Sequence, residues 1–139
     1  MSGTPPPLTV LYDADCGFCR FSVARLLDWD RGRRLRPVAI QSPEGDALLT
    51  AAGVAPADRL ASAHVLDDAG RVHSGGAAAA VIARELPAGA PVAWVLAALP
   101  GPTDRAYRFV AGHRTGISRF VPSRLKRAAA AQIARREVR

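Results

Sequence analysis

Cysteine is nearly absent from the 139-residue chain, which carries only Cys16 and Cys19. Small secreted domains that rely on disulfides for stability hold more cysteines at wider spacing. The composition therefore excludes a disulfide framework, and the close pair indicates redox chemistry or a metal site. Because isolated thiols of this kind are typical of reducing compartments, we expect a cytoplasmic protein.

The sequence also has little that resembles a signal peptide or a membrane span. Its start, MSGTPPPLTV, has neither the basic residues nor the hydrophobic stretch of a signal peptide. The longest nearly uncharged stretch, residues 86–103, contains four prolines and two glycines, which make a poor spanning helix. We therefore expect no transmembrane segment.

Acidic residues are scarce toward the C-terminus. Residues 105–139 hold ten basic and one acidic side chain, a net charge of +9, whereas residues 1–104 have a net charge of −2. A basic block of this kind is most often a solvated helix face. It can also contact an acidic partner, nucleic acid or an anionic membrane.

The length fits one domain with a sizeable core. Short β-branched runs predict strands at 8–12 and 35–40, and a turn at Gly70 predicts a hairpin over 62–75. Pro37 favours an edge position for the second strand. Capping residues and apolar spacing predict helices between the first two strands and at 42–53, 76–86, 91–99, 103–112 and 122–139.

This order of elements predicts an α/β fold. A helix between the first two strands implies a right-handed parallel pair, and the hairpin adds two antiparallel strands. The expected architecture is a thioredoxin-like four-stranded mixed sheet with flanking helices and a helical C-terminal extension.

The predicted organisation has three parts. Residues 1–7 are expected to be a disordered lead, and residues 8–121 the thioredoxin-like domain. Within that domain, the core covers about 8–86 and the helical extension covers 91–121. Residues 122–139 are expected to form a basic C-terminal helix.

Two finer expectations concern the extension. The apolar segment 91–99 predicts a buried helix that Pro100 and Pro102 end. Thr103 is expected to cap the helix that follows.

The spacing of the cysteines suits a redox pair. Residues three apart in a helix lie on one face, within about 6 Å between Cβ atoms, which is compatible with a disulfide. At a helix start, unpaired amides favour a thiolate at Cys16, which is therefore the expected nucleophile. Cys19, one turn deeper, would resolve the mixed disulfide. The expected substrate is a protein or small-molecule disulfide or thiol, with an unidentified recycling reductant and no cofactor.

Two acids precede the pair and complicate its chemistry. Asp13 and Asp15 repel a thiolate, so they oppose the effect of the helix start. We expect Asp15 to cap the helix. Asp13 either bonds local backbone or transfers a proton during exchange.

Further candidates lie at the predicted edge of the sheet. Ligands of open sheets bind where parallel strands end, which places Tyr12 and Gln41 near the cysteines. Ser62 approaches the same edge as it enters the third strand. Gly17 and Phe18, between the cysteines, complete the candidate set.

The stretch LYDADCGFC resembles the signature of the DCC family of thiol-disulfide oxidoreductases, which is named for an Asp-Cys-Cys motif. Further similarities are PVAIQSPEGDALL (37–49), the block 64–87, and a helix that carries Tyr107 and Arg114. The resemblance implies a thioredoxin-like fold and dithiol–disulfide exchange, with Cys16 as nucleophile and Cys19 as resolving thiol. Thioredoxins place a cis-proline before the third core strand, whereas this chain has DRLASAHV there.

Zinc binding is one alternative for the cysteine pair. Two thiolates with this spacing are half of a tetrahedral zinc site. The other half would have to come from His64, His73 and His113, of which His64 and His73 could face each other across the hairpin.

Two further alternatives use other residues. Asp13-x-Asp15 after a strand resembles a phosphotransferase of the haloacid-dehalogenase superfamily, but the expected Thr or Val after Asp15 is Gly17 and the only lysine is Lys126. The chain could also be a non-catalytic binding module that docks through its basic C-terminal segment.

Overall fold

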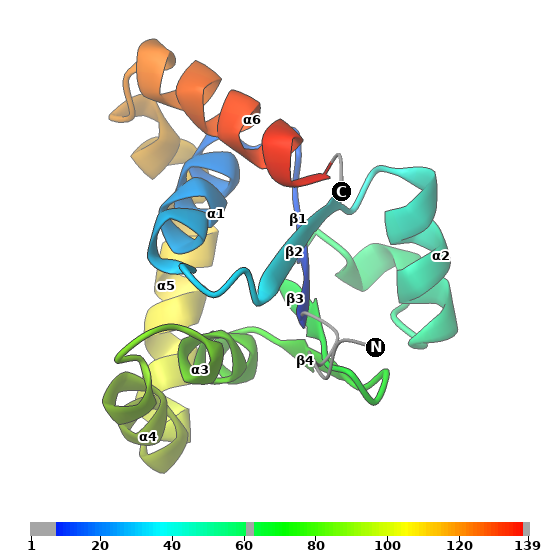
Figure 1. The fold of residues 1–139 in the computed structure, drawn as a ribbon, viewed down its shortest axis with the longest axis vertical. Helices are drawn as coiled ribbons and strands as arrows, with labels where there is room; N and C mark the ends of the chain where they lie inside the picture. Colours follow the sequence, from blue (N-terminus) through cyan, green and yellow to red (C-terminus); the bar gives the residue numbers. More distant parts are fainter. Residues whose placement is uncertain (1–7, 61–62, 138–139) are drawn as a thin grey trace.

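A four-stranded mixed sheet lies at the centre of the protein (Figure 1). The computed structural model describes residues 8–60 and 63–137. The strands follow the spatial order β2-β1-β3-β4; β1 and β2 are parallel, and the other pairs are antiparallel. Their bounds are β1 (Leu8–Tyr12), β2 (Leu35–Ala39), β3 (His64–Leu66) and β4 (Val72–Ser74). The predicted sheet is confirmed, with the Pro37 strand at an edge, whereas the expected lead at 1–7 lies outside the described residues.

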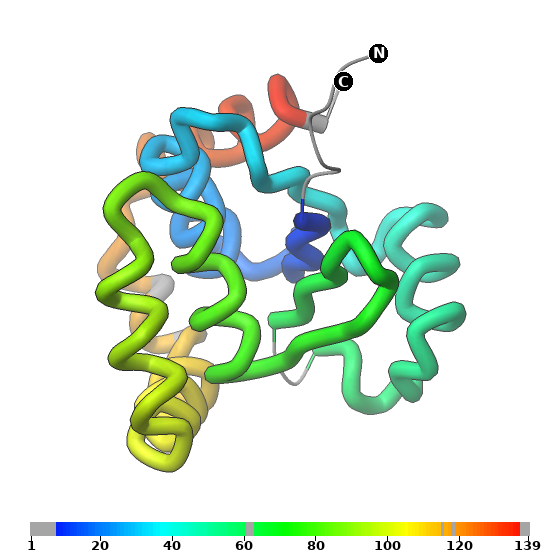
Figure 2. Tube along the Cα trace, turned by 60° about the horizontal axis from the view of Figure 1, so that its bottom comes forward, coloured from blue at the N-terminus to red at the C-terminus, as the bar shows by residue number. Residues whose placement is uncertain are grey.

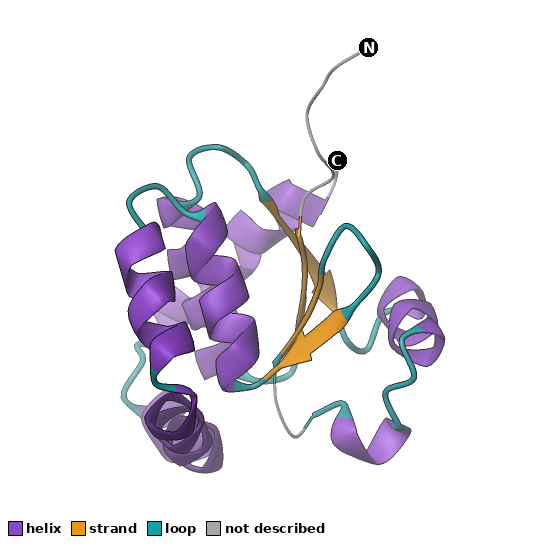
Figure 3. Ribbon diagram, turned by 90° about the horizontal axis from the view of Figure 1, so that it is seen from below, coloured by secondary structure: helices purple, strands orange, loops and turns teal. Residues whose placement is uncertain are grey.

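Helices cover both faces of this sheet, unequally. Helix α2 lies on one face, and α1, α3, α4, α5 and α6 lie on the other (Figures 2 and 3). The bounds of the helices in the described part of the chain are α1 (Gly17–Trp29), α2 (Pro43–Ala51), α3 (Gly76–Glu85), α4 (Ala90–Ala98), α5 (Pro100–Arg119), α6 (Ser123–Glu137) and the short 3₁₀ helix η1 (Pro56–Asp58).

The central strand β1 is buried on both faces, since side chains of a strand alternate between its two sides. Leu8, Val10 and Tyr12 join the core formed with α1, α3 and α6. Leu11 joins a second core with α2. Because β1 is held from both sides, its C-terminal end is a firm support for the residues that follow it.

The helical extension differs from the prediction in two ways. Helix α4 is not buried: Trp94 is 73% exposed, and only Ala93 of the helix is buried, because α4 packs on α3 with one side only. Helix α4 ends just before Pro100, as predicted, but Pro100 and Pro102 lie in the first turn of α5, where proline is tolerated. Thr103 therefore lies inside α5 and donates a hydrogen bond to the carbonyl oxygen of Leu96. No helix in the described ranges is long and apolar enough to cross a bilayer.

The basic C-terminal helix is packed against the domain. Ala129 and Ile133 of α6 are buried against α1. Arg136 reaches the buried carboxylate of Asp30 at 3.2 Å and also donates to backbone carbonyls, including that of Leu27. Helix α6 is therefore a structural part of the fold and not a free tail.

Candidate redox site

Cys16 is the N-cap of α1. Its Sγ accepts a hydrogen bond from the amide of Cys19 at 3.3 Å, so a sulfur occupies the capping position. The prediction that Asp15 caps α1 is wrong. Asp15 is exposed, and its amide donates to Asp13 Oδ1 at 2.9 Å. The hydrogen bond places Cys16 Sγ at the start of α1, where a backbone amide of the first turn points toward it.

Cys19 lies one turn into α1 and is partly buried, and both cysteines are free thiols. Burial, the hydrogen bond with Cys16 and the charge of Cys16 together raise the pKa of the Cys19 thiol to about 12, against the opposing effect of the Arg114 guanidinium. Cys19 is therefore a protonated thiol near neutral pH. The two sulfurs differ in environment, as a nucleophile and a resolving thiol would.

Asp13 connects the end of β1 to the end of β2. Its Oδ1 accepts a hydrogen bond from Gln41 Nε2 at 2.7 Å, and Gln41 Oε1 in turn accepts from the amide of Ala14 at 3.0 Å. The structure thus brings the predicted neighbours Asp13 and Gln41 together at the sheet edge. These hydrogen bonds tie the loop that leads into Cys16 to the residues after β2.

Two residues of α5 complete the site, and neither was among the predicted site residues. Arg114 Nη1 lies 3.8 Å from Cys19 Sγ, and Arg114 Nη2 lies 3.6 Å from Asp13 Oδ2. The hydroxyl of Tyr107 accepts a hydrogen bond from the amide of Ala63. Their one signal in the sequence is that both occur in a block that resembles the DCC family.

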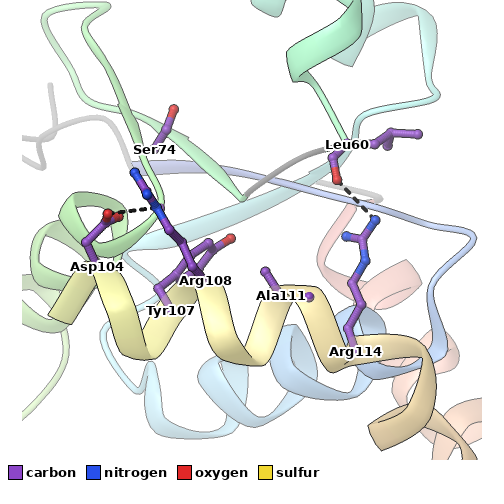
Figure 4. A pocket seen from close by; sticks show the side chains of 9 residues that line it. Leu60, Ser74, Asp104, Tyr107, Arg108, Ala111 and Arg114 are labelled. Atoms are coloured by element: carbon purple, nitrogen blue, oxygen red, sulfur yellow. Dashed lines mark hydrogen bonds and ion pairs between the residues drawn. The ribbon is translucent and has the colours of Figure 1, made fainter. Parts of the chain in front are cut away.

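Helix α5 also holds the segment that enters β3. Arg114 donates to the carbonyl oxygen of Leu60 at 3.0 Å (Figure 4). The hydroxyl of Tyr107 accepts from the amide of Ala63, immediately before β3. In thioredoxins the corresponding segment carries the cis-proline. The predicted site residue Ser62 lies outside the described residues.

An apolar cavity of about 380 Å³ adjoins Cys19. Tyr12 and Phe18 line it, so two more of the predicted residues lie at the site, whereas Gly17 is the first residue of α1. A wider, more polar hollow of about 550 Å³ lies beyond Tyr107 and Arg114, between α5 and the end of β4 (Figure 4).

The histidines do not approach the cysteines as a zinc site requires. His64 pairs with Ser74 across the hairpin, and His73 pairs with Val65, so the two histidines do not face each other. His64 contacts Ser74 and a backbone carbonyl, and His73 contacts Asp67. Within residues 8–60 and 63–137, no three His, Cys, Asp or Glu side chains gather as a metal site.

The fold and the cysteine pair define the class: a thioredoxin-like α/β domain with a C-x-x-C pair at the start of a helix. A family model described as DCC1-like thiol-disulfide oxidoreductase matches residues 10–120, and the chain belongs to this family. No curated protein and no solved structure matches the chain significantly.

Proposed function

We propose that the protein is a thiol-disulfide oxidoreductase in which Cys16 is the nucleophile and Cys19 the resolving thiol. The observation that carries this proposal is the contact between the two residues at the start of α1, where the amide of Cys19 points at Cys16 Sγ. The Cys16 thiolate attacks one sulfur of a substrate disulfide, and the other sulfur leaves as a thiolate. Cys19 then attacks Cys16 Sγ, which closes the protein disulfide and releases the second substrate thiolate.

Arg114 and Asp13 support the second step. Cys19 must lose its proton before it attacks, and the guanidinium 3.8 Å away stabilises the resulting thiolate. Asp13 holds Arg114 by an ion pair and is itself held by Gln41. In this proposal the Asp13 carboxylate accepts the proton that Cys19 releases.

The natural substrate is a protein or small-molecule disulfide, and an external thiol restores the dithiol form. We place the reaction in the cytoplasm, where such a thiol is supplied by the reducing pool. The exposed side chains of Arg124, Arg127 and Arg135 on α6 remain available to an acidic partner.

Titration against a glutathione redox buffer tests the proposal. The wild type should form one reversible intramolecular disulfide, measured by thiol alkylation and mass spectrometry. Cys16→Ser should form none and should not attack substrate, whereas Cys19→Ser should accumulate a mixed disulfide at Cys16. If the wild type forms no intramolecular disulfide at any ratio of reduced to oxidised glutathione, the proposed function is wrong.

A further inference from the structure

The apolar cavity beside Cys19 extends along α1. Side chains of one face of this helix line it from Phe18 to Trp29, which spans about 16 Å at 1.5 Å per residue. The opposite wall comes from α3, α4 and α5, with Ile82, Leu96 and Val110 as representatives. A volume of about 380 Å³ over that length is within the range of small-molecule sites.

The cavity is accessible from solvent. Three of its lining side chains, Trp29, Val92 and Val110, are 40%, 44% and 38% exposed. The indole of Trp29 is fixed at one end because its Nε1 donates to the carbonyl oxygen of Pro87 at 2.7 Å. An α-helix, which is about 10–12 Å wide with its side chains, exceeds this space, so the cavity fits one extended chain and not a docked helix.

The two ends of the cavity differ chemically. Cys19, Asp13 and Arg114 lie together at one end. Toward the other end, the lining side chains of α1, α3 and α4 are hydrophobic, as with Leu26 and Leu86. A ligand that satisfies both ends carries its sulfur at the cysteines and an uncharged aliphatic chain along α1.

We propose that the substrate is a small aliphatic disulfide whose hydrocarbon chain occupies this cavity. This inference rests on the proposed function and specifies its substrate class. Cys16 does not line the cavity, but its Sγ accepts a hydrogen bond from the amide of Cys19, which does, at 3.3 Å. Burial of the chain contributes to binding because each methylene removed from water is favourable.

The reaction balances without a further oxidant. The Cys16 thiolate bonds to the alkyl sulfur, and the other half of the substrate leaves as a thiolate. Cys19, after losing its proton, bonds to Cys16 Sγ, and the alkyl thiolate leaves the cavity. The protein cysteines are oxidised to a disulfide, the substrate disulfide is reduced to one thiol and one thiolate, and the proton of Cys19 passes to the products.

A series of mixed disulfides between alkanethiols and thionitrobenzoate measures the contribution of the chain. The pre-reduced protein releases the coloured aryl thiolate in a single turnover, and each rate constant is divided by that of free glutathione with the same compound. From methyl to octyl, the ratio should rise at least about 100-fold, since each buried methylene contributes up to about fourfold. Octyl chains that end in a hydroxyl should lose part of this gain.

Two variants of α3 test whether the hydrocarbon chain of the substrate occupies the cavity. Ala79 lines the cavity, whereas Ala77 is exposed on the same helix and does not line it. Ala79→Phe fills the space and should lower the octyl rate at least about tenfold, whereas Ala77→Phe should leave it unchanged. The wild-type series remains decisive if Ala79→Phe does not fold.

The outcomes separate the inference from the function on which it rests. If the wild-type series is flat while methyl and hydroxyethyl disulfides are reduced, or if the two α3 variants behave alike, the aliphatic substrate is wrong and the oxidoreductase stands. If no disulfide of any kind is reduced, the proposed function itself is wrong.

Discussion

Replacing Arg114 with methionine should suppress the reactivity of Cys19. Burial, Cys16 and Asp13 raise the pKa of the Cys19 thiol. Among the causes of the shift, the Arg114 guanidinium is the one that lowers this pKa. Methionine keeps most of the side-chain volume and removes the charge. The pKa of Cys19 should therefore rise above its value of about 12.

The size of the effect follows from the geometry. Unit charges 3.8 Å apart interact by about 4 kcal/mol at an effective dielectric constant near 20. The Arg114 side chain is 27% exposed and shares its charge with Asp13 at 3.6 Å, so solvent and the ion pair screen most of this energy. About a third of it, ~1.4 kcal/mol, corresponds to one pKa unit and a tenfold loss of thiolate.

The thiolate of Cys19 is measured by its alkylation. In a Cys16→Ser background, so that Cys19 is the only thiol, the rate of reaction with iodoacetamide at pH 9 should fall about tenfold in Arg114→Met. Arg114→Lys should lose less, because it keeps the positive charge. Arg108→Met is the matched control: this arginine is exposed on the same helix and pairs with Asp104.

Equal alkylation rates in the parent and in Arg114→Met would refute this electrostatic role. Thermal unfolding followed by circular dichroism checks that α5 still holds the segment before β3, since Arg114 also bonds to Leu60. An equal loss of alkylation rate in Arg108→Met would show that the effect comes from the net charge of the protein and not from the contact between Arg114 and Cys19.

Three further predictions concern the resolving step and the framework. The rate at which Cys19 resolves the mixed disulfide at Cys16 should rise about tenfold per pH unit from pH 7 to 9, because a pKa of about 12 means that only a small fraction of Cys19 is thiolate in this range. A rate that does not change with pH in stopped-flow measurements would contradict this. Arg136→Met should lower the free energy of unfolding by about 3–5 kcal/mol in urea titrations. The reason is that the carboxylate of Asp30, which is 1% exposed, loses the guanidinium with which it pairs. The exposed Arg135→Met should change this free energy by less than about 0.5 kcal/mol, and equal losses would be inconsistent with the buried pair. Hydrogen bonds from His73 and from backbone amides lower the pKa of Asp67 in the folded protein. The ionised Asp67 therefore stabilises the fold above about pH 4, and this contribution is lost as the pH falls toward the lowered pKa. The difference in the free energy of unfolding between the wild type and Asp67→Asn should shrink from pH 6 to pH 3.

Several features follow from local rules and could be predicted from the sequence. Ser42 caps α2, and Pro43 follows it in the first turn. Gly70 adopts a positive φ of 80° in the predicted hairpin turn. The meeting of Asp13 and Gln41 was also predictable, because parallel strands end at the same edge of a sheet.

The error at Asp15 has a local cause as well. Aspartate is a favoured cap, but Asp13 takes the Asp15 amide and leaves the capping position one residue later. The error at α4 has a tertiary cause. A helix that is apolar on all sides is usually buried, but in the described structure only α3 and part of α5 cover it.

The sequence by itself determined the succession of strands and helices along the chain, the turn at Gly70 and the one-turn spacing of Cys16 and Cys19, because each depends on residues close together in the chain. Only the tertiary structure decided what surrounds the pair. Arg114 lies 95 residues from Cys19 along the chain, and the cavity beside Cys19 has walls from four helices. Burial and the distance between charges set the reactivity of a thiol, and both depend on how α5 packs against α1, which no periodicity within either helix specifies.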